Sequence, residues 1–194
     1  DKGRDGCVIL KAGNGTKLSV SNLTVRGTSK WKPSDDAEPL ELAATASVYQ
    51  EMYQPGGGRG HWPVDVHTLS IIEPMDVLAV KLSENNITLK PGESKKIEVT
   101  IERAEGFEKN VSLDMRFFHL SEFCNTFPPG VKFDEGKSSK LITGKNLQGH
   151  VVITADANAA DVDKQLIPVT ANVSLNFVMK TSFGAEPLWI SVKK

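Results

Sequence analysis

The stretch NITLKPGESKKIEVTIERAEGFEKNV, residues 86–111, decides the fold of this chain. Every odd-numbered residue from 97 to 101 is apolar and its neighbours are polar, which is the period of a strand with one buried and one solvated face. Pro91 suits the first central position of a tight turn, and Gly92 accepts the positive φ of the second. We therefore predict a β-hairpin joined at Pro91-Gly92, within an antiparallel β-sandwich.

The same alternation marks the end of the chain. All odd-numbered positions from 167 to 179 are apolar, which predicts one long strand that bends near Pro168. Leu175 then lies in the core, and its truncation to Ala is expected to cost about 2 to 5 kcal/mol of folding free energy. The next residue, Asn176, is expected to tolerate substitution.

The first part of the chain is also β-rich. Even-numbered residues from 40 to 48 are apolar and predict a half-buried strand, and a glycine-rich segment follows at residues 54–63, QPGGGRGHWP, which we expect to form a loop. A boundary near Pro74 divides the chain into domains 1–77 and 78–194. The fold class expected is all-β, with two tandem antiparallel β-sandwich (Ig-like) domains of which the first is smaller or incomplete.

Composition excludes several classes of partner. The 23 basic and 24 acidic residues give a net charge of −1, so no positive field is available for nucleic acid. No apolar run is long enough for membrane insertion. Cys7 and Cys124 follow no metal-ligand spacing, and two unpaired thiols are favoured over a disulfide between them.

Several motifs carry a resemblance to known proteins. The order of LKPGE (residues 89–93), a strand, EGFEKNV (105–111), FPPGV (127–131) and a final pair of strands resembles the immunoglobulin-like or fibronectin-III-like repeats of large secreted bacterial proteins. The segment YQPGGGRGHWPV (53–64) followed by a second repeat is most similar to the tandem sandwich modules of exported and cell-envelope proteins of planctomycetes. The resemblance covers most of residues 40–194.

The resemblance implies a non-catalytic spacer or docking module of a larger exported protein, located outside the cytoplasm: extracellular, periplasmic or at the cell surface. The expected partners are a protein or a polysaccharide at the cell surface and other domains of the same parent chain. One alternative is a carbohydrate-binding accessory module that uses residues 54–63. A second alternative is a C-terminal fragment of a secreted hydrolase whose active site lies elsewhere.

The candidate ligand-binding residues are Arg59, His61 and Trp62, which offer a cation, a hydrogen-bonding ring and a stacking surface to a sugar or peptide. Against this, a ring next to Pro63 at the start of a strand is well placed to pack inward. We therefore favour burial of Trp62 as a structural anchor over its exposure as a binding platform.

Metal and cofactor chemistry has little support. Asp156, Asn158, Asp161 and Asp163 place oxygen atoms at a spacing that resembles a calcium loop, although the glycine of the sharp turn and the terminal glutamate are missing. A solvated turn is the favoured interpretation, with calcium as the weaker alternative and no other cofactor.

The histidines and hydroxyl residues do not form a known catalytic pattern. His61, His67, His119 and His150 lie in different segments without zinc-ligand spacing, and no nucleophile motif can be assembled. The chain is therefore predicted not to be an enzyme.

Overall fold

The computed structural model describes residues 8–13, 15–53, 56, 58–119, 121–176 and 179–194. In these residues the protein is all-β: strands and one short 3-10 turn are present, and no α-helix. The pairings between strands are antiparallel, with one parallel exception between β8 and β19. The all-β prediction is confirmed.

The chain folds into two compact units, which we name by what distinguishes them. The ribbon unit comprises Ala12–Glu73, and the core unit comprises Pro74–Lys194 together with the described residues 8–11. Residues 8–11 thus belong to the core unit, and the chain then passes through the ribbon unit and re-enters the core unit at Pro74. The expected domains were residues 1–77 and 78–194.

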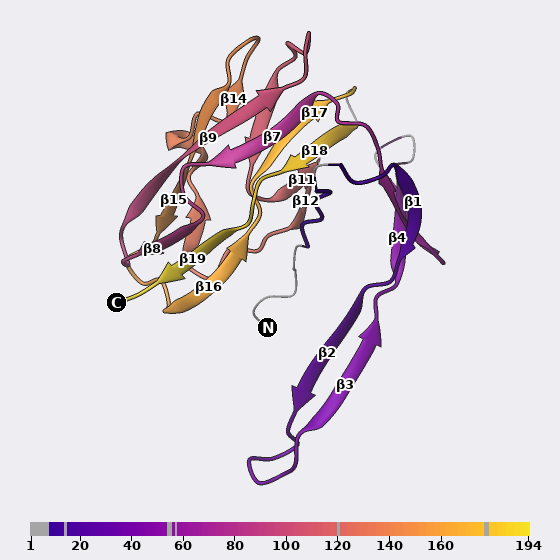
Figure 1. The fold of residues 1–194 in the computed structure, drawn as a ribbon. Coiled ribbons are helices and arrows are strands. Elements are labelled where there is room, and N and C mark those ends of the chain that lie inside the picture. Colours follow the sequence, from indigo (N-terminus) through magenta and orange to yellow (C-terminus); the bar gives the residue numbers. More distant parts are fainter. Residues whose placement is uncertain (1–7, 14, 54–55, 57, 120, 177–178) are drawn as a thin grey trace. The chain divides into compact units, whose positions relative to one another are not determined.

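The core unit contains most of the strands (Figure 1). They are β7 (Val77–Leu82), β8 (Asn86–Leu89), β9 (Ser94–Arg103), β10 (Val111–Asp114), β11 (Phe117–His119), β12 (Ser121–Cys124), β13 (Val131–Phe133), β14 (Leu141–Ile142), β15 (Gln148–Ala155), β16 (Val162–Ile167), β17 (Thr170–Ser174), β18 (Lys180–Gly184) and β19 (Leu188–Val192), with the 3-10 turn η1 (Glu135–Lys137). The sheets have the orders β13-β15-β9-β7, β14-β10-β17-β18 and β16-β19-β8, and β11 pairs with β12.

One hydrophobic core belongs to this unit, and alternate residues of its strands build it. In β9, Ile97, Val99 and Ile101 are buried while the residues between them are exposed. Each buried aliphatic side chain contributes about 1.5 to 3 kcal/mol relative to leaving it exposed. The alternation predicted for residues 97–101 is confirmed, and it holds β9 to one face of the core.

The Pro91-Gly92 turn forms, but it does not make a hairpin. Gly92 has a φ of 85°, as the turn requires. The strands on either side of it pair elsewhere: β8 lies parallel to β19, whereas β9 lies between β15 and β7. The hairpin prediction is wrong, because a local pattern specifies a turn and two strands without specifying their hydrogen-bonding partners. The turn carries the chain from one sheet to another.

The long strand predicted over residues 167–179 is divided in the structure. β16 ends at Ile167 and pairs with β19, and β17 starts at Thr170 and pairs with β10 and β18. After β17 the chain turns back, with the amide of Leu175 donating to the carbonyl of Met179 at 2.9 Å. Leu175 is 49% exposed, so the prediction that it lies in the core is wrong. Apolar residues continue to alternate with polar ones through this turn, so the sequence pattern did not show where the strand ends.

The described residues of the ribbon unit form three two-stranded antiparallel ladders. They join β1 (Ser19–Leu23) to β6 (His67–Ile71), β2 (Arg26–Trp31) to β3 (Leu40–Thr45), and β4 (Val48–Tyr53) to β5 (Arg59–Val64). The strand predicted over residues 40–48 is interrupted at Ala46-Ser47. Among the described side chains of this unit no hydrophobic one is buried. Its described hydrophobic side chains are therefore exposed or half-buried.

Candidate functional site

The predicted binding residues lie in a strand and not in a loop. β5 begins at Arg59, and it pairs with β4 in a register that places His61 opposite Glu51 and Trp62 opposite Gln50. The connection between the two strands is therefore shorter than the predicted loop 54–63. Pro63 fits into β5 because a strand at the edge of a sheet can lack one backbone donor.

This register separates the predicted residues. Neighbouring residues in a strand point to opposite faces, so His61 and Trp62 lie on different sides of the β4–β5 ladder. Residue 59 has the same parity as His61, and its side chain lies outside the described ones. The structure thus does not bring the three predicted residues together in one binding site.

Trp62 is exposed, contrary to the prediction of a buried anchor. Its side chain is 51% exposed, and its six-membered ring lies over Gly60, the residue two positions earlier on the same face of β5. A Cβ atom at position 60 would lie 2.1 Å from Cζ3 of Trp62, so the ring can take this position only above a glycine. The two-residue spacing Gly-x-Trp on a strand is the sequence signal for this arrangement.

The strands β4, β5 and β6 also form an open depression of about 350 Å³. Gln50, which lies opposite Trp62, is part of its wall together with Tyr49 and His67. The remaining lining residues are Val48, Val64, Val66 and Thr68. The volume is at the lower end of the range for small-molecule sites, and the lining mixes apolar and hydrogen-bonding side chains.

The four candidate calcium residues are divided between a turn and a strand: Asp156 and Asn158 belong to the turn after β15, whereas Asp161 precedes β16 and Asp163 lies in it. Asp156 forms an ion pair with Lys132 at 2.9 Å, and this hydrogen bond raises the pKa of the lysine. The carbonyl of Asp156 accepts from the amide of Ala159, which is buried next to Gly130. Within the described part of the chain, no three acidic, histidine or cysteine side chains gather in a way that could hold a metal ion.

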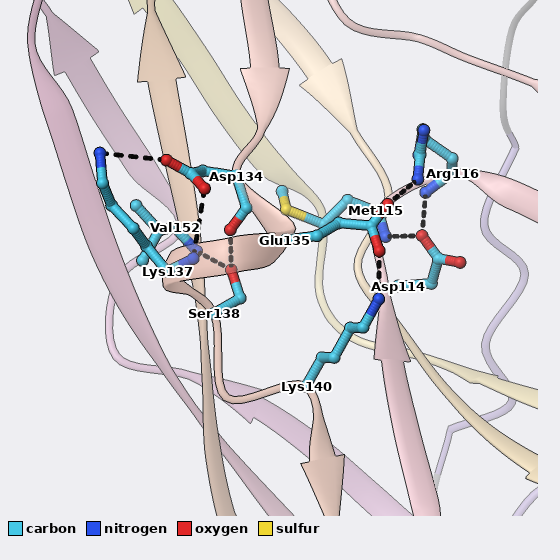
Figure 2. Close-up of polar contacts among 9 residues, drawn as sticks. All are labelled: Asp114, Met115, Arg116, Asp134, Glu135, Lys137, Ser138, Lys140 and Val152. Atoms are coloured by element: carbon cyan, nitrogen blue, oxygen red, sulfur yellow. Dashed lines mark hydrogen bonds and ion pairs between the residues drawn. The ribbon is translucent and has the colours of Figure 1, made fainter.

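A group of charged side chains linked by ion pairs lies around η1 (Figure 2). Glu135 accepts hydrogen bonds from Arg116 and from Lys140, which come from the end of β10 and the approach to β14. Hydrogen bonding from Lys140 lowers the pKa of Glu135 below its ordinary value of 4.5. The sequence DEGKSSK (residues 134–140), with two acids followed by lysines, is the signal that the prediction missed.

The other half of this group caps the turn. Oδ1 of Asp134 accepts from the amide of Lys137 at 3.2 Å, and Oδ2 pairs with Nζ of the same lysine at 3.1 Å. These hydrogen bonds lower the pKa of Asp134. The hydroxyl of Ser138 donates to the carbonyl of Asp134 at 2.6 Å and accepts from the amide of Val152 at 2.8 Å. The group therefore fastens η1 to β15, and the proton of the Ser138 hydroxyl is used in the hydrogen bond to the carbonyl of Asp134.

The histidines do not assemble a catalytic site in the described residues. The ring of His150 lies against the carbonyl of Lys137, with Nε2 at 3.0 Å, so Nε2 carries the proton and donates. His67 belongs to β6, and His61 to β5. For His119 the side chain is not described, and Cys7, half of the possible disulfide with Cys124, also lies outside the described residues.

Comparison with known proteins adds no identification. No protein-family model matches this sequence, and no curated protein is significantly similar to it. In the described part of the chain, no helix has the length and apolar character needed to span a membrane.

Proposed function

We propose that this chain is a non-catalytic interaction module of a larger exported protein. In this proposal the core unit is an immunoglobulin-like β-sandwich that serves as a stable mount, and the ribbon unit presents the surface that binds a protein partner at the cell surface. The module acts outside the cytoplasm and needs no cofactor. Any catalytic domain of the parent, such as a hydrolase, is a separate part.

The observation that supports this proposal is that hydrophobic side chains are buried in the core unit and exposed in the ribbon unit. The core unit has a complete hydrophobic core, whereas apolar side chains of the ribbon unit such as Val20, Tyr49 and Val66 are more than half exposed. Soluble proteins rarely leave contiguous apolar surface open unless another molecule covers it. Exposed tyrosine and tryptophan side chains are the residue types that contribute most at protein interfaces.

A binding assay with the complete chain tests this proposal. The chain should cosediment with cell-envelope material of its own organism, and Tyr49→Ala or Val20→Ala should weaken the binding about tenfold or more. Leu78→Ala is the matched control, because Leu78 is also exposed but belongs to the core unit. Absence of binding, or an equal loss in the Leu78 variant, would contradict the proposal.

Polysaccharide binding through Trp62 is the second candidate, and the exposure of this ring specifically favours it. The indole is held by Gly60 beneath it while half of its surface stays accessible. An aromatic ring in such a position can stack on the apolar face of a sugar. Gln50 on the adjacent strand supplies a hydrogen-bonding group on the same face of the ladder.

Fluorescence titration with a panel of plant, algal and bacterial polysaccharides tests this candidate. Binding should disappear in Trp62→Ala and persist in Trp31→Ala, whose ring is equally exposed on another ladder. If both variants bind like the unmodified chain, Trp62 is not the contact residue. If no polysaccharide binds, the candidate is refuted.

A further inference from the structure

The β2–β3 ladder has one apolar and one polar face. Its register pairs Trp31 with Leu40 and Ser29 with Leu42 on one face, with Gly27 and Ala44 continuing the same face. The opposite face carries the pairs Arg26 with Thr45, Thr28 with Ala43 and Lys30 with Glu41. All twelve residues of the two strands are exposed, so the apolar face has no cover in this structure. Figure 1 shows the two strands as an elongated antiparallel ribbon.

The apolar face tapers along the ribbon. At the end near the connecting turn, the pair Trp31 and Leu40 supplies two large side chains that are 52% and 50% exposed. At the other end, the pair Gly27 and Ala44 supplies almost none, and the space above Gly27 is open. A face of this shape is complementary to its own copy when the two ribbons run in opposite directions. The large pair of each copy then covers the small pair of the other.

The charges favour the same antiparallel arrangement. The turn between β2 and β3 carries the exposed carboxylates Asp35, Asp36 and Glu38 beside Lys32, whereas Arg26 marks the opposite end of the ribbon. Two copies stacked turn to turn would bring like charges together, which is unfavourable. When the turn of each copy lies at the opposite end of the other ribbon, the two acidic turns are far apart and this repulsion is avoided.

We propose that the apolar face of the β2–β3 ribbon binds the same face of a second copy of this chain, with Leu42 on the two-fold axis. Such an interface is isologous, because the same patch serves both partners. The inference rests on the proposed function, since it identifies a second copy as one partner of the ribbon unit. The depression beside Tyr49 and the Trp62 face lie on other ladders and are not used by it.

The size of the face sets the strength of association. Trp31, Leu40 and Leu42, each about half exposed, present on the order of 300 Å² of apolar surface per copy, well below the roughly 800 Å² per partner of a standard stable interface. We therefore expect a weak dimer with a dissociation constant of roughly tens to hundreds of micromolar. Association should be visible only as a function of concentration.

Sedimentation equilibrium of the complete chain from about 10 μM to about 1 mM measures this range. The average mass should rise from the 21.1 kDa of the single chain toward twice that value. Gly27→Leu fills the space that receives Trp31 of the other copy, and should raise the dissociation constant about tenfold or more. Thr28→Leu is the matched control, because it adds the same side chain next door on the polar face and should leave association unchanged.

Crosslinking tests the geometry independently. Facing sheets pack about 10 Å apart, so a thiol-specific crosslinker of about that span should join two Leu42→Cys chains. Ala43→Cys, one residue along and on the opposite face, should give only the background that the unmodified chain shows from its own cysteines.

A chain that stays monomeric throughout the concentration range overturns the inference. Equal weakening by Gly27→Leu and Thr28→Leu, or equal crosslinking of the two cysteine variants, also overturns it, because the dimer then uses another surface. The proposed function fails in a different experiment. In that case the chain does not bind envelope material although it still self-associates. A monomeric chain that still binds envelope material refutes the second copy alone.

Discussion

Replacing Gly130 with alanine tests the packing that holds the DANAAD turn, residues 156–161, onto the core unit. Gly130 precedes β13, has a φ of 81°, and accepts a hydrogen bond from the amide of Asp156 at 2.7 Å. A Cβ atom built on it would lie 2.8 Å from Cα of Ala159, a backbone atom that cannot move without the turn. Ala159 itself is buried in the core.

The cost has two parts. A left-handed backbone conformation costs a residue with a Cβ atom about 1 to 2 kcal/mol relative to glycine. The steric conflict with Ala159 adds about 1 to 3 kcal/mol, the usual range for an overpacked site. Together they predict a loss of roughly 2 to 5 kcal/mol in the free energy of unfolding, a large fraction of the total for a domain of this size.

Gly92→Ala separates the two parts. Gly92 has a nearly identical φ of 85°, and a Cβ atom there would meet nothing within 4 Å, so this variant should lose only the 1 to 2 kcal/mol of backbone strain, about what left-handed residues cost. Urea titrations of both variants and the unmodified chain, followed by circular dichroism, give the free energies by linear extrapolation. Equal losses would refute the close packing of the turn against Gly130.

Two other predictions concern burial and pH. Leu113 is 2% exposed, so Leu113→Ala should lower the free energy of unfolding, measured by urea titration, by about 2 to 5 kcal/mol. Leu175→Ala should lower it by less than about 1 kcal/mol, because Leu175 is exposed. A larger loss for Leu175→Ala would support the single long strand over residues 167–179. The pKa of Glu135 is lowered on folding, mainly by Lys140, so its contribution to stability is present above its ordinary pKa of 4.5 and is lost as the pH falls through the folded value. The difference in unfolding free energy between the unmodified chain and Glu135→Gln should therefore shrink on acidification below about pH 4.5, and a difference that grows there would refute the ion pair with Lys140 as its source.

The candidate site was only partly predictable. The composition of residues 59–62 drew attention to an aromatic residue beside glycines, but the predicted site required three side chains on one surface. Adjacent residues can contact the same ligand in a loop, but in a strand their side chains point to opposite faces. Because residues 59–64 form a strand, His61 and Trp62 lie on opposite faces. The position of the Trp62 ring depends on a contact with Gly60, where no Cβ atom blocks it. A contact of this kind cannot be read from the alternation of apolar and polar residues.

The sequence by itself determined the all-β class, the buried face of β9 and the turn at Gly92, because these depend on neighbours a few residues apart. Only the tertiary structure decided which strands pair, since β8 finds its partner in β19, about a hundred residues along the chain. Backbone hydrogen bonds between strands do not depend on the side chains. The choice of partner for each strand therefore depends on which arrangement buries all the apolar faces in one core. The ribbon unit has the same alternation without such closure, and no hydrophobic residue among its described side chains is buried.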